Sequence, residues 1–413
     1  MTAEAAILVG AGALFVVTAV SGRLHDLWIT EPLLATALGL IAGLTIIDPV
    51  EMESRAILTI LELTLALVLF SDASRIDVAR LRNGYSWPMR MLVVGLPLAI
   101  VLGAAFGGWY LGVPLGVALL LGVILAPTDA ALAEPVLESS VVPGRVRQTL
   151  NVESGLNDGL ALPALLIAIG LIETETGAGP GRAVQLVVGQ LGIGVVGGFA
   201  IGWLGAFLIG RGTVAGWMNP LHQKIAAVAL ALAGFSAVQL IGGSGFVATF
   251  IAGGLMSHLI KPRREYLYDF AEEEGHSLVL VAFFIFGAGQ AAELIIRGIP
   301  VEAIVIAFVA LFLVRPVAIA LSLLGQKLSG RTIVFLGWFG PRGLATIVFV
   351  LVAVEELEMT DPLIVDVVTF TVIASIVLHG VTARPASRWL AALEMTEDMP
   401  EMGETFEHKM RRL

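Results

Sequence analysis

Three carboxylates lie inside long hydrophobic segments of the chain. Asp129 follows the pair Pro127-Thr128, and Glu153 and Asp158 lie in the next hydrophobic segment. An ionised carboxylate at the centre of a bilayer costs at least about 2.5–3.5 kcal/mol on insertion scales, so membrane helices rarely carry one without a function. Three of them within one predicted helical hairpin therefore indicate a site for a cation or a proton.

The residues around two of these carboxylates are suited to bind a small, hard cation. Pro127 has no N–H group and interrupts a helix, which frees backbone carbonyls as ligands. Thr128 adds a hydroxyl beside Asp129, and Ser154 and Asp158 are four residues apart, on one face of a helix. The pattern predicts a cage of carboxylate, hydroxyl and carbonyl oxygens for Na⁺ or Li⁺, formed by Thr128, Asp129, Ser154 and Asp158.

Asp158 is the residue that we expect to carry both the cation and the proton. A carboxylate removed from water favours its neutral form, so a buried Asp can hold either species near neutral pH. Competition for one carboxylate is the simplest physical basis of exchange. The alternative is that Asp158 caps a helix near Gly159, but the hydrophobic run continues well past that point.

Two arginines, Arg315 and Arg342, also fall inside predicted membrane spans. A lone arginine in the membrane needs a buried partner. Glu153 and Asn157 form a second pair four residues apart, and we predict that Glu153 pairs with Arg315; the alternative is that Glu153 faces water. Arg342 lies in a predicted helix break, where its charge offsets helix dipoles or nearby carboxylates, unless its side chain extends to the membrane surface.

Three further acidic residues follow or lie within apolar runs. Asp72, at the end of the third predicted helix, is placed to receive cations at the cytoplasmic mouth, or it is a plain interfacial residue. Glu62 and Asp366 are given no role.

The composition identifies an all-α, polytopic membrane protein. Of 413 residues, 57% are hydrophobic and 14% are charged. A soluble domain could not hide so large an apolar surface from water. About thirteen segments have the ~20 apolar residues of a spanning helix. They start near Ala5, Trp28, Arg55, Met89, Leu115, Val146, Ala183, Leu221, Gly245, Ser277, Val301, Arg331 and Pro362.

Several classes of function are disfavoured. The chain has no cysteine, and its net charge of −10 does not favour nucleic-acid binding. The six histidines have no metal-ligand spacing, and there is no Walker-type phosphate loop. We therefore expect a transporter rather than an enzyme, with no cofactor apart from the transported ions.

The loop charges predict the orientation. With thirteen spans, one face receives only Arg55, Arg182 and Arg297, and the other receives most remaining basic residues. Cytoplasmic loops carry the excess of Lys and Arg, which places the N-terminus outside and the C-terminus in the cytoplasm. We expect a transmembrane domain over residues 1–394 and a short cytoplasmic tail over 395–413.

An internal repeat is also predicted. The helix breaks at Pro127 and Pro341 are 341 − 127 = 214 residues apart, and the same offset relates neighbouring helix starts. Two three-helix units separated by an odd number of spans must be inverted, and matched broken helices mark a transporter's binding site near the membrane midplane. The expected parts are core helices over about 89–172 and 301–384, and scaffold helices over about 5–72 and 183–297.

The string Glu153-Ser154-Gly155-Leu156-Asn157-Asp158, with Thr128-Asp129 and the turn Gly340-Pro341-Arg342-Gly343, resembles the monovalent cation:proton antiporter-1 family of NhaP-type sodium/proton antiporters. The resemblance implies the NhaA/NhaP-like fold, with a six-helix core that moves against a dimerisation domain in a homodimer of the cell membrane.

The same resemblance also implies roles for single residues. Asp158 is the main ion and proton carrier, helped by Thr128, Asp129 and Ser154, and Glu153, Asn157 and Arg315 form a structural cluster. Asn157 before Asp158 implies electroneutral one-for-one exchange.

The function expected from the sequence is therefore Na⁺(Li⁺)/H⁺ antiport by alternating access, serving pH homeostasis. Three alternatives stay open. A K⁺/H⁺ antiporter of the same fold uses the same ligand types. An ion channel would require a ring of filter residues around an open axis. A sodium:solute symporter would require a larger pocket for an organic substrate.

Overall fold

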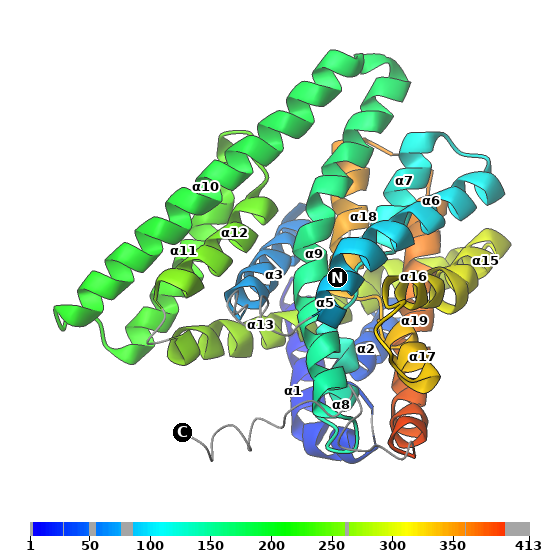
Figure 1. Cartoon of the computed structure of the whole chain (residues 1–413), viewed down its shortest axis with the longest axis horizontal. Coiled ribbons are helices and arrows are strands. Elements are labelled where there is room, and N and C mark those ends of the chain that lie inside the picture. Colours follow the sequence, from blue (N-terminus) through cyan, green and yellow to red (C-terminus); the bar gives the residue numbers. More distant parts are fainter. Residues whose placement is uncertain are drawn as a thin grey trace.

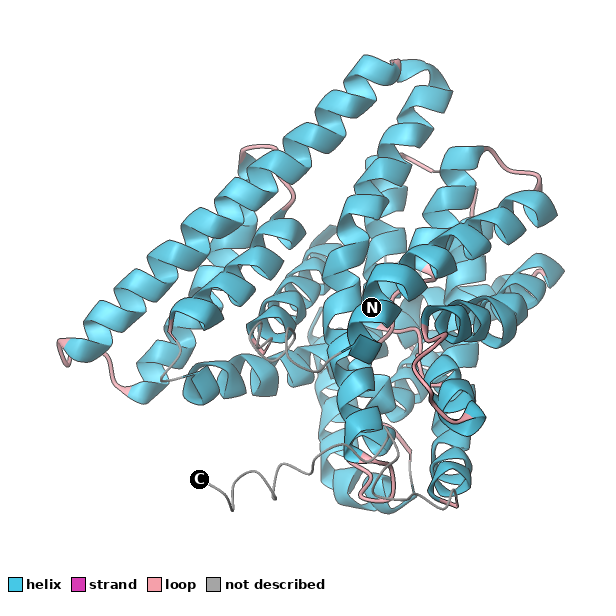
Figure 2. Cartoon of the chain, viewed as in Figure 1, coloured by secondary structure: helices cyan, strands magenta, loops and turns pink. Residues whose placement is uncertain are grey.

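The computed structural model describes residues 3–27, 29–48, 55–75, 86–260, 264–359 and 361–392. In this described part the helices are joined by loops and turns, and there is no strand (Figure 2). The predicted tail at 395–413 lies outside the described residues.

The chain folds as a succession of helices joined by short connections (Figure 1). The first half comprises α1 (Ala3–Leu27), α2 (Glu31–Thr45), α3 (Arg55–Ser74), α5 (Ser86–Arg90), η2 (Met91–Gly95), α6 (Leu96–Leu111), α7 (Leu115–Ile124), α8 (Ala130–Leu137), α9 (Gly144–Glu173), η3 (Thr174–Ala178) and α10 (Pro180–Val214). The second half comprises α11 (Pro220–Leu240), α12 (Gly245–Leu259), α13 (Arg264–Phe286), η5 (Gly287–Ala291), α14 (Ala292–Arg297), α15 (Val301–Val309), η6 (Ala310–Val314), α16 (Arg315–Ser322), α17 (Gly330–Trp338), α18 (Leu344–Glu356) and α19 (Leu363–Ala391).

Eight helices of the described chain are long and apolar enough to cross a membrane, and four shorter apolar helices accompany them. When the two parts of an interrupted helix are taken as one span, all but one of the spans begin within three residues of the predicted positions. The exception is α13, which begins at Arg264 and not near Ser277. Hydropathy locates only the apolar part of a helix, and the polar first turns of α13, with residues 272–274 all Glu, are good helix formers that the hydropathy criterion misses.

The predicted repeat is visible in the order of the elements. A helix with a π-helical turn, a broken helix and a long helix occur first as α5 to α9 and again as α15 to α19. The starting residues of the three matched passages differ by 301 − 86 = 215, 330 − 115 = 215 and 363 − 144 = 219. These offsets are close to the 214 predicted from the two prolines.

The two broken helices meet at their breaks. The first break separates α7 from α8 and contains Pro127, and the second separates α17 from α18 and contains Pro341. The backbone N–H of Asp129 donates a hydrogen bond of 2.8 Å to the carbonyl of Pro341. Non-helical backbone at membrane depth is tolerated where protein buries it, and each unwound segment here gives the other a partner.

The helices pack in two groups (Figure 1). Helices α10, α11 and α12 lie on one side and pack with α3 and α13, whereas α5 to α9 and α15 to α19 lie on the other. Helix α9 borders both groups, because it contacts α7 and α8 as well as α3, α10 and α12. The candidate residues Glu153, Ser154, Asn157 and Asp158 therefore lie where the two groups meet.

Candidate functional site

One helix places four candidate residues together. Glu153, Ser154, Asn157 and Asp158 are all buried in the first half of α9. Asp158 lies in the helix interior, so the alternative that it merely caps a helix is wrong.

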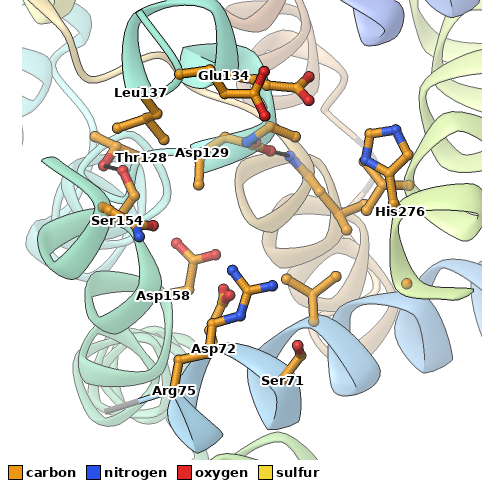
Figure 3. A pocket seen from close by; sticks show the side chains of 18 residues that line it. Ser71, Asp72, Arg75, Thr128, Asp129, Glu134, Leu137, Ser154, Asp158 and His276 are labelled. Carbon is orange, nitrogen blue, oxygen red and sulfur yellow. Dashed lines mark hydrogen bonds between the residues drawn. The ribbon is translucent and has the colours of Figure 1, made fainter. Parts of the chain in front are cut away.

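A cavity of about 360 Å³ opens beside these residues (Figure 3). Its polar wall comes from α3, the first helix break, α8, α9 and α13. The side chains that form this wall are Ser71, Asp72, Arg75, Thr128, Asp129, Glu134, Glu138, Asn151, Ser154, Asp158 and His276. All four residues of the predicted cation cage thus line one cavity.

Asp158 is 6% exposed and lies within the cavity, below Ser154 in the close-up view (Figure 3). Its Oδ1 is buried and accepts no hydrogen bond from any residue that the structure describes. A buried polar atom without a partner is costly unless a ligand or a proton satisfies it. Asp158 is therefore placed to bind what enters the cavity.

Asp129 has a different environment from the one we predicted. Its Oδ1 accepts hydrogen bonds from the N–H groups of Ala131 (2.8 Å) and Leu132 (3.3 Å), at the start of α8. Its Oδ2 accepts one of 2.8 Å from the N–H of Leu344, at the start of α18. Helix N-termini carry partial positive charge and unsatisfied N–H groups, so this one carboxylate caps both half-helices. Both of its oxygens are already engaged, which makes Asp129 a poorer cation ligand than the sequence implied.

The close approach of the two helix breaks depends on a glycine. A Cβ atom built on Gly343 would overlap the carboxylate of Asp129. Any larger residue at position 343 would push the carboxylate away from the N-terminus of α18, so glycine is required here for close approach rather than for its backbone angles.

Glu153 and Arg315 form a buried ion pair. Arg315 Nη1 and Nη2 donate to the two oxygens of Glu153 at 2.9 and 3.0 Å, and both side chains are 4% exposed. Arg315 follows the π-helical turn η6 and also donates to the carbonyl of Phe339 at 3.3 Å. The pair links the two repeats, and the alternative that Glu153 faces water is wrong.

Asn157 and Thr128 complete this network. Asn157 Nδ2 donates to Thr128 Oγ1 at 2.6 Å, and Thr128 Oγ1 donates to Glu153 at 3.3 Å. The Thr128 hydroxyl also lies 3.0 Å from that of Ser154. The break between α7 and α8 is thereby attached to α9 through the hydroxyl of Thr128.

Arg342 is 1% exposed, so its side chain does not extend to the membrane surface. Its Nη1 donates to the carbonyl of Gly340 at 2.6 Å, beyond the C-terminal end of α17, and its backbone N–H donates to Ser375 Oγ at 2.7 Å. Among the described residues it forms no ion pair with a carboxylate. A cation beside the negative end of a helix dipole is favourable, so this position suits the first of the two roles that the sequence indicated, and that role stays a prediction.

Asp72, on α3, lines the cavity beside Asp158 of α9 (Figure 3). A Cβ atom built on Gly155 would lie 3.6 Å from the Cβ of Asp72, so this side chain packs against the α9 backbone. The position suits a residue that ions pass on their way to Asp158. Its role, like the ion-binding roles of the other site residues, stays a prediction.

Two basic residues of the cavity escaped the sequence reasoning. Arg75, at the end of α3, counted only as a loop charge, and His276 belongs to no recognisable motif. His276 Nε2 lies 2.8 Å from Glu31 Oε2, which joins α13 to α2 beside the cavity. No spacing along the chain points to His276, because its partner is 245 residues away.

Comparison with known proteins agrees with this architecture. The chain is 25% identical over 341 residues to the K⁺/H⁺ antiporter NhaP of Alkalimonas amylolytica, covering 82% of this chain and 58% of that protein. It is 25% identical over 356 residues to the Na⁺/H⁺ antiporter ApNhaP of Aphanothece halophytica, covering 82% of this chain and 66% of that protein. The chain thus spans less than two thirds of the length of these curated relatives.

The fold is that of a solved antiporter. The structure of the sodium proton antiporter MjNhaP1 from Methanocaldococcus jannaschii superimposes with a TM-score of 0.77 at 21% identity, covering 95% of this chain and 100% of that one. Residues 10–389 match the transmembrane sodium/hydrogen exchanger family. Paired broken helices and a carboxylate cavity at their crossing are thus accompanied by a family match over nearly the whole chain, and the protein belongs to the sodium/hydrogen exchanger family of monovalent cation:proton antiporters.

Proposed function

We propose that this antiporter exchanges Na⁺ or Li⁺ for H⁺, and that the two ions compete for the carboxylate of Asp158. The observation that carries the proposal is the difference between the three membrane carboxylates. Glu153 is paired with Arg315, and Asp129 is held by backbone N–H groups at two helix ends, whereas Asp158 Oδ1 has no partner among the described residues. Asp158 is thus the carboxylate whose charge is free to be neutralised by a transported ion.

The ligands around Asp158 suit a hard monovalent cation. Ser154 is one helical turn away on the same face of α9, and its hydroxyl lies 3.0 Å from that of Thr128. Carboxylate and hydroxyl oxygens are hard donors, which favour alkali ions over soft metals. Entry of a cation would draw these hydroxyl oxygens from one another toward the ion.

The site also supports electroneutral exchange. The neighbour of Asp158 is Asn157, a neutral amide that donates to Thr128, and it offers no second titratable group. One carboxylate binds one monovalent cation or one proton, so the loaded site has the same charge in both directions. One-for-one exchange then moves no net charge and is insensitive to the membrane potential.

Transport by alternating access requires the site to face each side in turn. We assign the movement to the core, α5 to α9 and α15 to α19, relative to a scaffold of α1 to α3 and α10 to α14. The scaffold would form the contact in a homodimer. The protein would lie in the cell (inner) membrane, with its N-terminus outside and its C-terminus in the cytoplasm, and would serve pH homeostasis.

K⁺/H⁺ exchange is the second candidate, since the relative from Alkalimonas amylolytica is named a K⁺/H⁺ antiporter. The same oxygen ligands serve both cations, and the curated relatives carry both names. Na⁺/H⁺ exchange and K⁺/H⁺ exchange differ in the cation that collapses a pH gradient, and the following experiment identifies that cation.

The test is cation-induced collapse of an acid-inside pH gradient in proteoliposomes, with Na⁺, Li⁺ and K⁺ compared at free and clamped membrane potential. We expect Na⁺ and Li⁺ to collapse the gradient equally well under both conditions. The Asp158→Asn variant should be inactive, and Asp361→Asn, at an exposed aspartate before α19, should match the wild type. A response to K⁺ alone would establish the second candidate, and full activity of Asp158→Asn would refute the assignment of the carrier. A flux that does not saturate with cation would indicate a channel.

A further inference from the structure

A second cavity, of about 280 Å³, lies on the other side of Asp158. Three helices of the first cavity, α3, α9 and α18, also line this one, but with residues from their opposite ends. The residues that line it are Arg55, Glu62, Leu162, Leu165, Leu166, Ile169, Gln190, Gln239, Ser244, Phe246, Val352, Glu355 and Glu356.

Only a short barrier separates the two cavities. On α9 the first cavity ends at Asp158 and the second begins at Leu162, one turn or about 6 Å further along the helix. The ring of Phe250, on α12, covers Gly159 so closely that a Cβ atom there would overlap it. The two cavities therefore lie on one line along α9, interrupted beside the proposed carrier.

The second cavity is more polar than a packing defect in a membrane protein would be. Glu62, in the middle of α3, lines it together with Gln190, Gln239 and Glu356. Ionisable and polar groups inside a membrane domain are costly and mark ion or substrate paths. This arrangement offers a reason for Glu62, which has no part in the first cavity.

An ion pair lies at the end of this cavity that is farther from Asp158. Arg55, the first residue of α3, contacts the carboxylate of Glu355, near the end of α18. Helix α3 belongs to the group assigned to the scaffold, and α18 belongs to the group assigned to the core. A contact that joins two groups across a cavity must break if they separate there.

We propose that the second cavity is the closed half of the ion pathway, and that the Arg55–Glu355 ion pair holds it closed while the first cavity is open. The inference rests on the proposed transport function, since alternating access needs one open and one closed half. Breaking the pair would favour the conformation that opens the second cavity. The side chains are 75% and 32% exposed, and ion pairs so accessible to water are weak, so the populations should shift by about fivefold at most.

The absence of cysteine from the chain allows a direct test, since one introduced cysteine is then the only thiol. Leu166→Cys reports on the second cavity and Val68→Cys on the first. A membrane-impermeant maleimide is applied to each face of oriented vesicles, and the labelling rate is measured. We expect Leu166→Cys to react slowly, from the face opposite to that which labels Val68→Cys.

Adding Arg55→Gln should raise the rate at Leu166→Cys by two- to fivefold and lower the rate at Val68→Cys. The charge-swapped pair Arg55→Glu with Glu355→Arg should restore the original rates, and Arg182→Gln, at an exposed arginine of α10, should change neither. Unchanged rates in Arg55→Gln, or labelling of both cysteines from one face, would overturn the inference. Labelling needs no transported ion, so a failure of Na⁺/H⁺ exchange in proteoliposomes would be recognised separately.

Discussion

The ion pair between Glu153 and Arg315 makes the sharpest prediction about stability. Replacing Glu153 with Gln keeps the shape of the side chain but removes its charge, and it leaves Arg315 buried without a counter-ion. Both side chains are 4% exposed, so water cannot compensate. We expect the Glu153→Gln variant to be strongly destabilised, whatever its effect on transport.

The magnitude follows from the contacts. Arg315 donates two charge-assisted hydrogen bonds to Glu153, at 2.9 and 3.0 Å, and hydrogen bonds to charged groups contribute about 1.5–3 kcal/mol each. Removal of one partner from a buried ion pair costs about 3–5 kcal/mol. The variant keeps the bond from Arg315 to the Phe339 carbonyl and one to the new amide oxygen, so we expect about 3 kcal/mol, at the lower end of that range.

The assay is chemical unfolding in detergent micelles, followed by the fluorescence of the seven tryptophans. Glu153→Gln, Arg315→Gln and the double variant form a mutant cycle, which isolates the coupling between the two residues. Because the double variant buries no unpaired charge, it should be more stable than the sum of the two single losses predicts, by about 2 kcal/mol or more. The exposed Glu302→Gln, on α15, is the matched control and should change stability by less than about 0.5 kcal/mol.

The reasoning would be refuted by a Glu153→Gln variant that unfolds at the wild-type denaturant concentration. Strict additivity in the cycle would also refute it, because the two residues would then contribute independently. A loss of the same size in Glu302→Gln would show that the assay reports total charge and not the buried pair.

Three further expectations follow from the site. Asp129→Asn should lower the free energy of unfolding by about 1–3 kcal/mol, measured as above, since a neutral amide interacts less favourably with two helix N-termini; an equally stable variant would contradict its capping role. Gly343→Ala and Gly340→Ala should each lose most cation-driven proton flux. The added methyl group overlaps Asp129 in the first variant and Arg315 in the second. The control Gly330→Ala, with nothing within 4 Å of the added atom, should retain the flux. If cation and proton compete at Asp158, the apparent KM for the cation should rise as the pH falls, by up to about tenfold per pH unit. The maximal rate at saturating cation should be the same at every pH. A KM that does not depend on pH would exclude competition.

Features that depend on local chain properties could be predicted from the residues alone. Hydrophobic length located the spans, and Pro127 and Pro341 located both helix breaks, because a missing N–H interrupts a helix wherever it occurs. Spacings of four residues placed Ser154 with Asp158, and Glu153 with Asn157, on shared faces of α9, because the helical period fixes which side chains are neighbours. The pairing of the buried Arg315 with Glu153 also followed, since few carboxylates were available at membrane depth.

The tertiary structure alone decided which of these groups are already satisfied. Asp129 looked like a cation ligand next to Thr128, yet its carboxylate caps α8 and also α18, whose first residue is 215 positions further along the chain. His276 joined the cavity only because α13 packs beside α3.

The second cavity likewise depends on contacts between distant segments. Neither Glu62 nor the pairing of Arg55 with Glu355 could be interpreted from neighbours in the sequence. Local spacing specifies which groups a helix presents, but the partner that neutralises each group comes from the crossing of distant segments. That crossing engages both oxygens of Asp129 and of Glu153, whereas Asp158 Oδ1 has no partner among the described residues.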